Sequence, residues 1–154
     1  ASFDPDAFVR LTRRLAPVPL AQFYGSDRDQ GAVAMSARNA ERAGVAHLAA
    51  FHHAVISEVA PPCETPGLVV ANPPYGSRIG NKGALFGLYA AFGEAMRTRF
   101  KGWRVGLVTA DPALAKATKL AFGEPSAPID HGGIKIRLSQ AGQLRGGWRS
   151  LLMN

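Results

Sequence analysis

The stretch of residues 68–76 constrains the fold more than any other part of this chain. A run of apolar residues, 68–71, is typical of a buried parallel strand, and it ends at Asn72. Pro73 and Pro74 follow, and each proline fixes its own φ and holds the preceding residue in an extended conformation. We therefore predict a rigid loop at the carboxyl end of a central strand, where open α/β sheets bind their ligands.

The groups on this loop suit a planar ring that bears an exocyclic amino group. The side-chain oxygen of Asn72 and the carbonyl of Pro73 can each accept one N–H, while Tyr75 stacks on the ring. When both N–H groups are hydrogen-bonded to these two acceptors, the amino nitrogen is drawn out of conjugation with its ring. Its lone pair is then free to attack. The alternative is an ordinary exit from a strand into a turn, because Asn-Pro is a common turn opener.

Length, charge and cysteine count limit the classes of protein to which this chain can belong. The 154 residues predict one domain, 1–154, with a single core, and the net charge of +7 favours nucleic acid as partner, with plain solvation as the alternative. No apolar run approaches the roughly 20 residues of a membrane span, and the first residues do not resemble a signal peptide. The single cysteine, Cys63, excludes an internal disulfide and a cysteine-cluster metal site. We expect a cytoplasmic protein without a metal.

Asp27 is the second candidate for a functional residue. Residues 1–19 are predicted to be a helical lead-in segment, followed by a strand over 20–25 and a helix over 30–43. Asp27 lies between that strand and that helix, where doubly wound folds hold the ribose hydroxyls of an adenosyl cofactor. Helix capping is the alternative role, although Asp29 is the better cap because the helical pattern begins directly after it.

Strands and helices also alternate over the rest of the chain. We predict strands over 47–51 and 103–109, helices over 84–100 and from 112 to about 120, and an antiparallel hairpin over 128–138. His52 and His53 point to opposite sides of an extended chain, so they cannot share a metal ion.

Residues 76–83 form a glycine-rich, basic segment that contains Arg78 and Lys82. The segment lacks the spacing of a P-loop, which excludes that kind of phosphate site. Contact with a nucleic-acid backbone and a plain flexible loop are equally good interpretations of this segment.

Three sequence pieces carry a resemblance to a known family: Gly-Ser-Asp at 25–27, Asn-Ala-Glu-Arg-Ala-Gly at 39–44, and Asn-Pro-Pro-Tyr-Gly-Ser-Arg-Ile-Gly at 72–80. Over nearly its whole length the chain resembles the class I S-adenosylmethionine-dependent methyltransferases. More narrowly, it is similar to bacterial RNA guanine-N2 methyltransferases in which this domain follows a THUMP RNA-binding domain. The resemblance implies an α/β fold, a Rossmann-like sheet with helices on both faces and a C-terminal antiparallel hairpin.

The resemblance also implies a reaction and its residues. S-adenosylmethionine would be the cofactor, with Ser26, Asp27 and Asn72 binding it and Asn72 to Tyr75, including both prolines, at the target amino group. The implied reaction is methyl transfer to an exocyclic amino group of an RNA base, guanine N2 of ribosomal RNA, with Arg78 and Lys82 on the nucleic acid. The same loop also serves adenine N6 in DNA and side-chain amides in proteins, and the loop alone does not separate these targets.

Two departures from the family pattern affect the expectations. No glycine-rich turn of the family type precedes Leu20, so we expect a C-terminal fragment without the THUMP domain and without the central first strand. The acidic residue that the family places near the adenine corresponds to Val55, which is apolar. Because loss of a central strand exposes two sheet edges, we expect self-association.

Two other classes of function compete with methyl transfer. A module that only binds nucleic acid is favoured by the missing glycine-rich turn. A dinucleotide-dependent oxidoreductase is a weaker alternative, because the chain contains no Gly-x-Gly-x-x-Gly.

Overall fold

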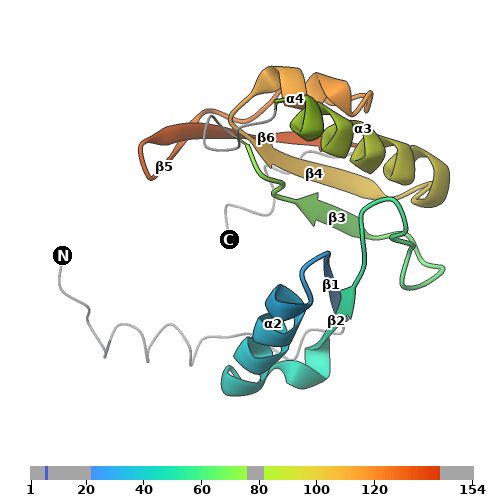
Figure 1. Ribbon diagram of the computed structural model, residues 1–154, viewed down its shortest axis with the longest axis vertical. Helices are drawn as coiled ribbons and strands as arrows, with labels where there is room; N and C mark the ends of the chain where they lie inside the picture. The colour runs from blue at the N-terminus through green and yellow to red at the C-terminus, as the bar shows by residue number, and fades with distance from the viewer. Residues whose placement is uncertain (1–5, 7–21, 76–81, 143–154) are drawn as a thin grey trace. The chain divides into compact units, whose positions relative to one another are not determined.

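The computed structural model describes Asp6 and residues 22–75 and 82–142 (Figure 1). It divides into two compact units, Ala1–His53 and Ala54–Asn154. The predicted helix in segment 1–19 lies outside the described residues apart from Asp6, which is helical. The expected single domain over 1–154 stays a prediction.

The first unit is a two-stranded parallel sheet with one helix. Its elements are β1 (Phe23–Asp27), α2 (Gln30–Arg42), the 3-10 turn η1 (Ala46–Leu48) and β2 (Ala49–His53). Asp29 caps α2 as predicted, because its side chain accepts a hydrogen bond from the Gly31 N–H at 2.7 Å. The helix ends before Gly44, whose φ of 71° is the left-handed conformation expected of a glycine at a helix end.

The two strands of this unit lie further along the chain than predicted. The strand expected over 20–25 is β1, which begins at Phe23 and ends at Asp27. The strand expected over 47–51 is β2, which begins only at Ala49, because the residues before it form η1. The reason is the ladder itself, in which Phe23 pairs with Ala49 and Asp27 pairs with His53. Each strand extends as far as its partner offers hydrogen bonds, which the local sequence does not reveal.

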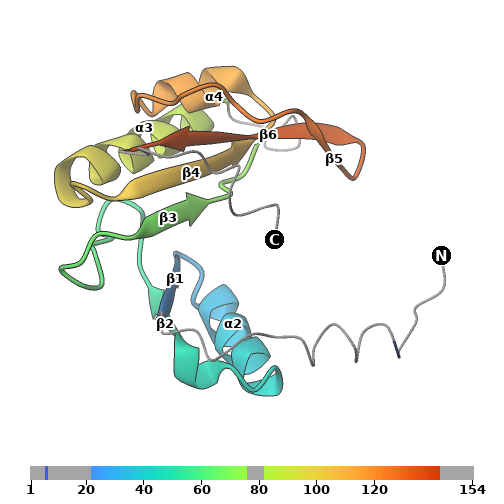
Figure 2. The ribbon, with the colours of Figure 1, turned by 180° about the vertical axis from the view of Figure 1, so that it is seen from behind.

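The second unit contains a four-stranded mixed sheet with two helices (Figures 1 and 2). Its elements are β3 (Leu68–Ala71), α3 (Lys82–Arg99), β4 (Arg104–Thr109), α4 (Pro112–Ala117), β5 (Ile129–His131) and β6 (Ile134–Ala141). The strand order is β3-β4-β6-β5, with β3 and β4 parallel and β6 antiparallel to both of its neighbours. The expected C-terminal hairpin is β5–β6, and its turn uses Gly132 and Gly133 at positive φ.

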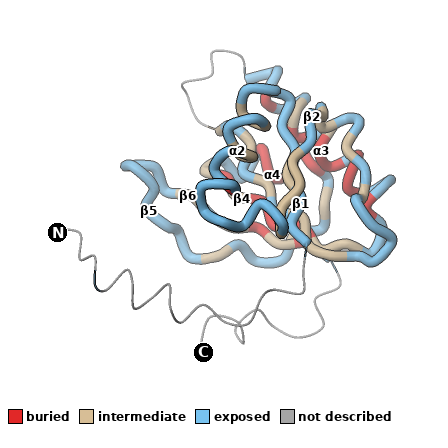
Figure 3. Tube along the Cα trace, turned by 90° about the horizontal axis from the view of Figure 1, so that it is seen from below, coloured by how far each residue is buried: buried red, intermediate tan, exposed pale blue. Residues whose placement is uncertain are grey.

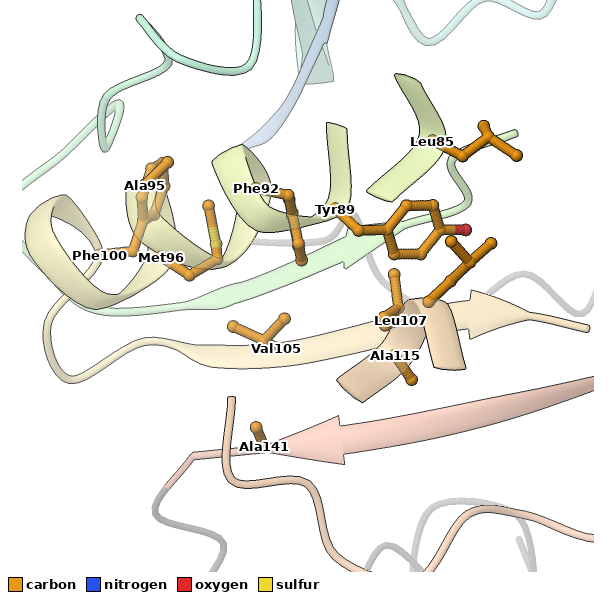
Figure 4. Close-up of a cluster of buried hydrophobic side chains, with 11 residues drawn as sticks. Leu85, Tyr89, Phe92, Ala95, Met96, Phe100, Val105, Leu107, Ala115 and Ala141 are labelled. Carbon is orange, nitrogen blue, oxygen red and sulfur yellow. The ribbon is translucent and has the colours of Figure 1, made fainter. Parts of the chain in front are cut away.

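The core of the second unit lies between the helices and one face of the sheet. α3 and α4 pack on the same side of β4, and the buried positions concentrate in these three elements (Figure 3). α3 contributes Leu85, Tyr89, Phe92 and Met96, which fall on one helical face with the predicted period. Val105 and Leu107 of β4 face this row of side chains (Figure 4).

The described strands confirm the mixed α/β fold class. In the described part of the chain, β1 is hydrogen-bonded only to β2, and β3 only to β4, so each has one unpaired edge. The first unit contains the parallel pair β1–β2, and the second contains the parallel pair β3–β4 and the antiparallel hairpin β5–β6, as the sequence predicted. Within residues 22–75 and 82–142, no helix is both long and apolar enough to span a membrane.

Candidate functional site

The loop of residues 72–75 leaves β3 at its carboxyl end, as predicted. The prediction of a buried, central strand was wrong: among the described residues β3 pairs only with β4, at the edge of the four-stranded sheet, and Val70 is 64% exposed. Asn72 and Pro74 are exposed, whereas Pro73 is half-buried. Tyr75 is also half-buried and packs against the core cluster of the second unit. The loop is therefore anchored by its last residue, while the amide of Asn72 is open to solvent.

Beneath the loop lies a buried tyrosine, Tyr89, whose role was not predicted from the sequence. The hydroxyl of Tyr89 lies 3.4 Å from the carbonyl oxygen of Pro74 and 3.5 Å from Oγ1 of Thr109. Burial, more than any other effect, raises the pKa of Tyr89 above its ordinary value. Helical periodicity predicted only that residue 89 faces inward, and the one available signal was its identity, because a buried tyrosine hydroxyl needs a partner.

Asp27 stands at the end of β1, in the first unit. Its Oδ1 accepts a hydrogen bond from the Asp29 N–H at 2.8 Å, and the cap of α2 is supplied by Asp29 itself. The structure therefore assigns helix capping to Asp29 and leaves the exposed Asp27 carboxylate to order the turn between β1 and α2.

A small hollow lies beside this turn. It has a volume of about 130 Å³, and it is lined by Gly25, Ser26, Asp27, Val33, Ser36 and Phe51. Pockets that enclose a whole drug-sized ligand measure roughly 300–1,000 Å³, so this hollow has room for a fragment the size of a sugar. Its lining joins two hydroxyls and a carboxylate to an aromatic ring, which suits a polyhydroxylated group.

His53 holds the turn from the neighbouring strand. Its Nε2 lies 2.9 Å from the carbonyl oxygen of Arg28, and because a carbonyl only accepts, Nε2 carries the proton. No local sequence pattern predicts this contact, since it joins residues at the ends of two different strands. Among the described residues, no group of three His, Cys, Asp or Glu side chains is placed to hold a metal ion.

The predicted site residues thus fall into two groups. Ser26 and Asp27 lie together in the first unit, and Asn72 to Tyr75 lie together in the second. Lys82 is the exposed first residue of α3, and Arg78 lies outside the described residues.

A comparison with protein families and a comparison with curated proteins both identify methyltransferases as similar to this chain. A family model described as "RMKL-like, methyltransferase domain" matches residues 5–137. The ribosomal RNA large subunit methyltransferase K/L of Shewanella baltica strain OS155 is 43% identical over 99 residues, and strain OS195 gives the same identity. The match covers 64% of this chain but only 14% of that relative, so the chain corresponds to a small part of the longer protein.

Solved structures share the fold over most of this chain. A possible methylase from Clostridium difficile 630 has a TM-score of 0.73 at 25% identity, covering 93% of this chain and 36% of that one. TrmN from Thermus thermophilus has a TM-score of 0.65 at 26% identity, covering 89% of this chain and 40% of that one. SMU.472 has a TM-score of 0.76 at 21% identity, and the match covers 94% of this chain and 39% of SMU.472. At that identity the likeness shows the fold alone.

Proposed function

Because this chain belongs to the family of RMKL-like methyltransferase domains, we propose that it takes part in methyl transfer from S-adenosylmethionine to an exocyclic amino group of an RNA base. The observation that carries the proposal is the Asn72–Tyr75 loop at the carboxyl end of β3, anchored by Tyr75 on the core. The net charge of +7 and the ribosomal RNA named for the Shewanella baltica relative favour RNA, and we propose guanine N2 as the atom.

In the proposed mechanism the loop positions the nucleophile. The Asn72 side-chain oxygen and the Pro73 carbonyl accept the two N–H bonds of the amino group, and Tyr75 stacks on the base. S-adenosylmethionine, when bound, would supply the methyl group from its sulfonium, with the neutral thioether as leaving group. Positioning would then provide much of the rate, and no strong base is needed because the methylated amino nitrogen can release its proton to solvent. The base has to be unpaired or flipped out to reach the loop.

The cofactor side of the proposal concerns Ser26, Asp27 and Asn72. The Asp27 carboxylate and the Ser26 hydroxyl border the 130 Å³ hollow, whose size and polar lining suit the ribose. SMU.472, which shares the fold, was solved in complex with SAH.

The partners and location are proposals of the same kind. We propose that Arg78 and Lys82 contact the RNA backbone, that the RNA is ribosomal, that a THUMP domain accompanies this domain, and that the protein is cytoplasmic. We also propose that the isolated chain self-associates through its unpaired strand edges, because Phe23, Tyr24 and Val70 are exposed on β1 and β3. A clean monomer in light scattering would contradict self-association.

Two substitutions of Asn72 test the role of the loop in the full-length protein. We expect Asn72→Ala to abolish methyl transfer to RNA, because it removes one of the two acceptors. We expect Asn72→Asp to retain measurable transfer, because a carboxylate oxygen still accepts the N–H. Turnover of labelled S-adenosylmethionine on RNA, DNA and protein substrates measures both, and normal turnover by Asn72→Ala would exclude the proposed role.

Calorimetric titration of S-adenosylmethionine into the same protein tests the cofactor side. We expect Asp27→Ala to lose saturable binding, whereas Asp29→Ala, two residues away, weakens only the cap of α2. If the unsubstituted protein binds RNA but not S-adenosylmethionine, the chain is a nucleic-acid-binding module instead.

A further inference from the structure

The carbonyl of Pro74 is the least constrained element of the loop backbone. Pro73 and Pro74 each have a fixed φ, and the proline at 74 also restricts ψ of residue 73. The one soft torsion left between the Pro73 carbonyl and Tyr75 is therefore ψ of Pro74. This torsion sets both the direction of the Pro74 carbonyl and the plane of the peptide bond that leads into Tyr75.

Tyr89 contacts the group that this torsion turns. Its side chain is fully buried, with 0% exposure, between α3 and β4, and its hydroxyl points toward the carboxyl ends of β3 and β4 (Figure 4). The hydroxyl oxygen lies 3.4 Å from the Pro74 oxygen. A hydrogen bond there holds the Pro74 carbonyl in one direction, and the surrounding core keeps the tyrosine ring from moving with the loop.

The hydroxyl is also connected to the next strand. It lies 3.5 Å from Oγ1 of Thr109, the last residue of β4, and Thr109 Oγ1 accepts from the Asp111 N–H at 3.1 Å. Asp111 in turn caps α4 by accepting from the Ala113 N–H at 2.8 Å. The loop after β3 is therefore tied through two hydroxyls, those of Tyr89 and Thr109, to the start of α4.

The chemical state of Tyr89 suits a donor. Burial raises its pKa, so the hydroxyl keeps its proton at neutral pH. The one hydroxyl proton of Tyr89 has two acceptors within reach, the Pro74 carbonyl at 3.4 Å and Thr109 Oγ1 at 3.5 Å. Because a carbonyl only accepts, the hydrogen bond to Pro74 requires Tyr89 as the donor.

We propose that Tyr89 is a positioning residue, whose hydroxyl fixes the Pro74 carbonyl and thereby the orientation of Tyr75 relative to the acceptors on Asn72 and Pro73. The inference rests on the proposed methyl transfer, because those acceptors hold the target amino group there. Tyr89 acts through the loop and does not touch the base.

Tyr89→Phe in the full-length protein tests the inference, because it removes the hydroxyl and keeps the ring. We expect kcat for methyl transfer to fall about tenfold or more, because misplacement of reacting groups by an ångström costs up to about a hundredfold. We expect KM for S-adenosylmethionine to stay unchanged.

Two matched variants separate positioning from stability. Tyr24→Phe removes an exposed hydroxyl from β1 and is expected to leave kcat unchanged. Phe92→Leu destabilises the same core one turn along α3 without removing a hydroxyl. A fall in kcat in Phe92→Leu as large as in Tyr89→Phe would overturn the inference.

A second readout does not depend on activity. Tyr75 is the only tyrosine in this chain that follows a proline, so labelling proline with ¹³C at the carbonyl and tyrosine with ¹⁵N isolates the Pro74–Tyr75 peptide bond. Loss of the signal in Tyr75→Phe assigns it. We expect the Pro74 carbonyl resonance to move upfield in Tyr89→Phe, because the carbonyl loses a hydrogen-bond donor.

The outcomes are distinguishable. An unmoved resonance, or an unchanged kcat in an active protein, overturns the role of Tyr89 and leaves the proposed function standing. A wild-type protein that transfers no methyl group to any substrate overturns the proposed function, and the positioning role with it.

Discussion

Replacing Gly93 with alanine tests how closely α3 packs against the turn that follows α4. A Cβ at this position would lie 1.8 Å from the carbonyl oxygen of Thr118 and 2.5 Å from its carbonyl carbon. Real Cβ atoms keep at least 3.0 Å, so the backbone of Thr118 has to move by about 1.2 Å or more. Thr118 is fully buried, and its backbone oxygen accepts a hydrogen bond from Arg97.

The expected loss in the free energy of unfolding follows from these contacts. Overpacking a core of this kind costs about 1–3 kcal/mol, and weakening the Arg97 hydrogen bond adds about 1 kcal/mol. The higher helix propensity of alanine returns about 1 kcal/mol, which leaves a net loss of about 1–3 kcal/mol. For a chain of this size each kcal/mol shifts Tm by about 2–4 °C, so we expect Gly93→Ala to lower Tm by about 2–12 °C.

Gly87 on the same helix is the matched control. A Cβ there meets nothing within 4 Å, so Gly87→Ala gains helix propensity without a clash and is expected to raise the free energy of unfolding by about 0.5–1 kcal/mol. Urea denaturation followed by circular dichroism measures both variants, with an unchanged m-value as the sign that only stability differs. If Gly93→Ala is as stable as Gly87→Ala, the close packing of α3 against Thr118 is wrong.

Three further predictions concern the candidate site. Asp29→Ala removes the cap on α2 and is expected to lower the free energy of unfolding by about 1 kcal/mol, measured by urea denaturation; an unchanged midpoint would show that the Gly31 N–H finds another acceptor. Gly25→Ala places a Cβ 2.7 Å from the ring of Phe51, so we expect the ring to move into the hollow and to weaken S-adenosylmethionine binding in calorimetry. Burial raises the pKa of Tyr89 in the folded state above 10.0, so the folded protein holds this proton more tightly than the unfolded chain. The contribution of Tyr89 to the free energy of unfolding is therefore complete below about pH 10 and is lost as the pH rises through the folded pKa. The free energy of unfolding falls there by up to about 1.4 kcal/mol per pH unit. We expect Tyr89→Phe to reduce this fall, measured as urea midpoints at a series of pH values.

Local sequence rules located most of the elements. The strand over 68–71 and the helix cap at Asp29 lie where they were predicted, because prolines and capping side chains act on their immediate neighbours. The boundaries of β1 and β2 were wrong by two to three residues, because a ladder is set by the partner strand. The helix predicted to reach about residue 120 ends at Ala117, where Thr118 turns the chain with a bond from its hydroxyl to the Ala115 carbonyl at 2.7 Å.

The sequence by itself determined the chemistry that the chain carries: the amide, prolines and aromatic ring of residues 72–75 at a strand end, and the carboxylate at Asp27. These depend on residue identity and on rules that reach only a few positions along the chain. The tertiary structure alone decided what supports those groups, namely the contact of Tyr89 with Pro74 across 15 residues and of His53 with Arg28 across 25. Such contacts join residues that only the packing of helices on strands brings together, and no local pattern encodes that distance.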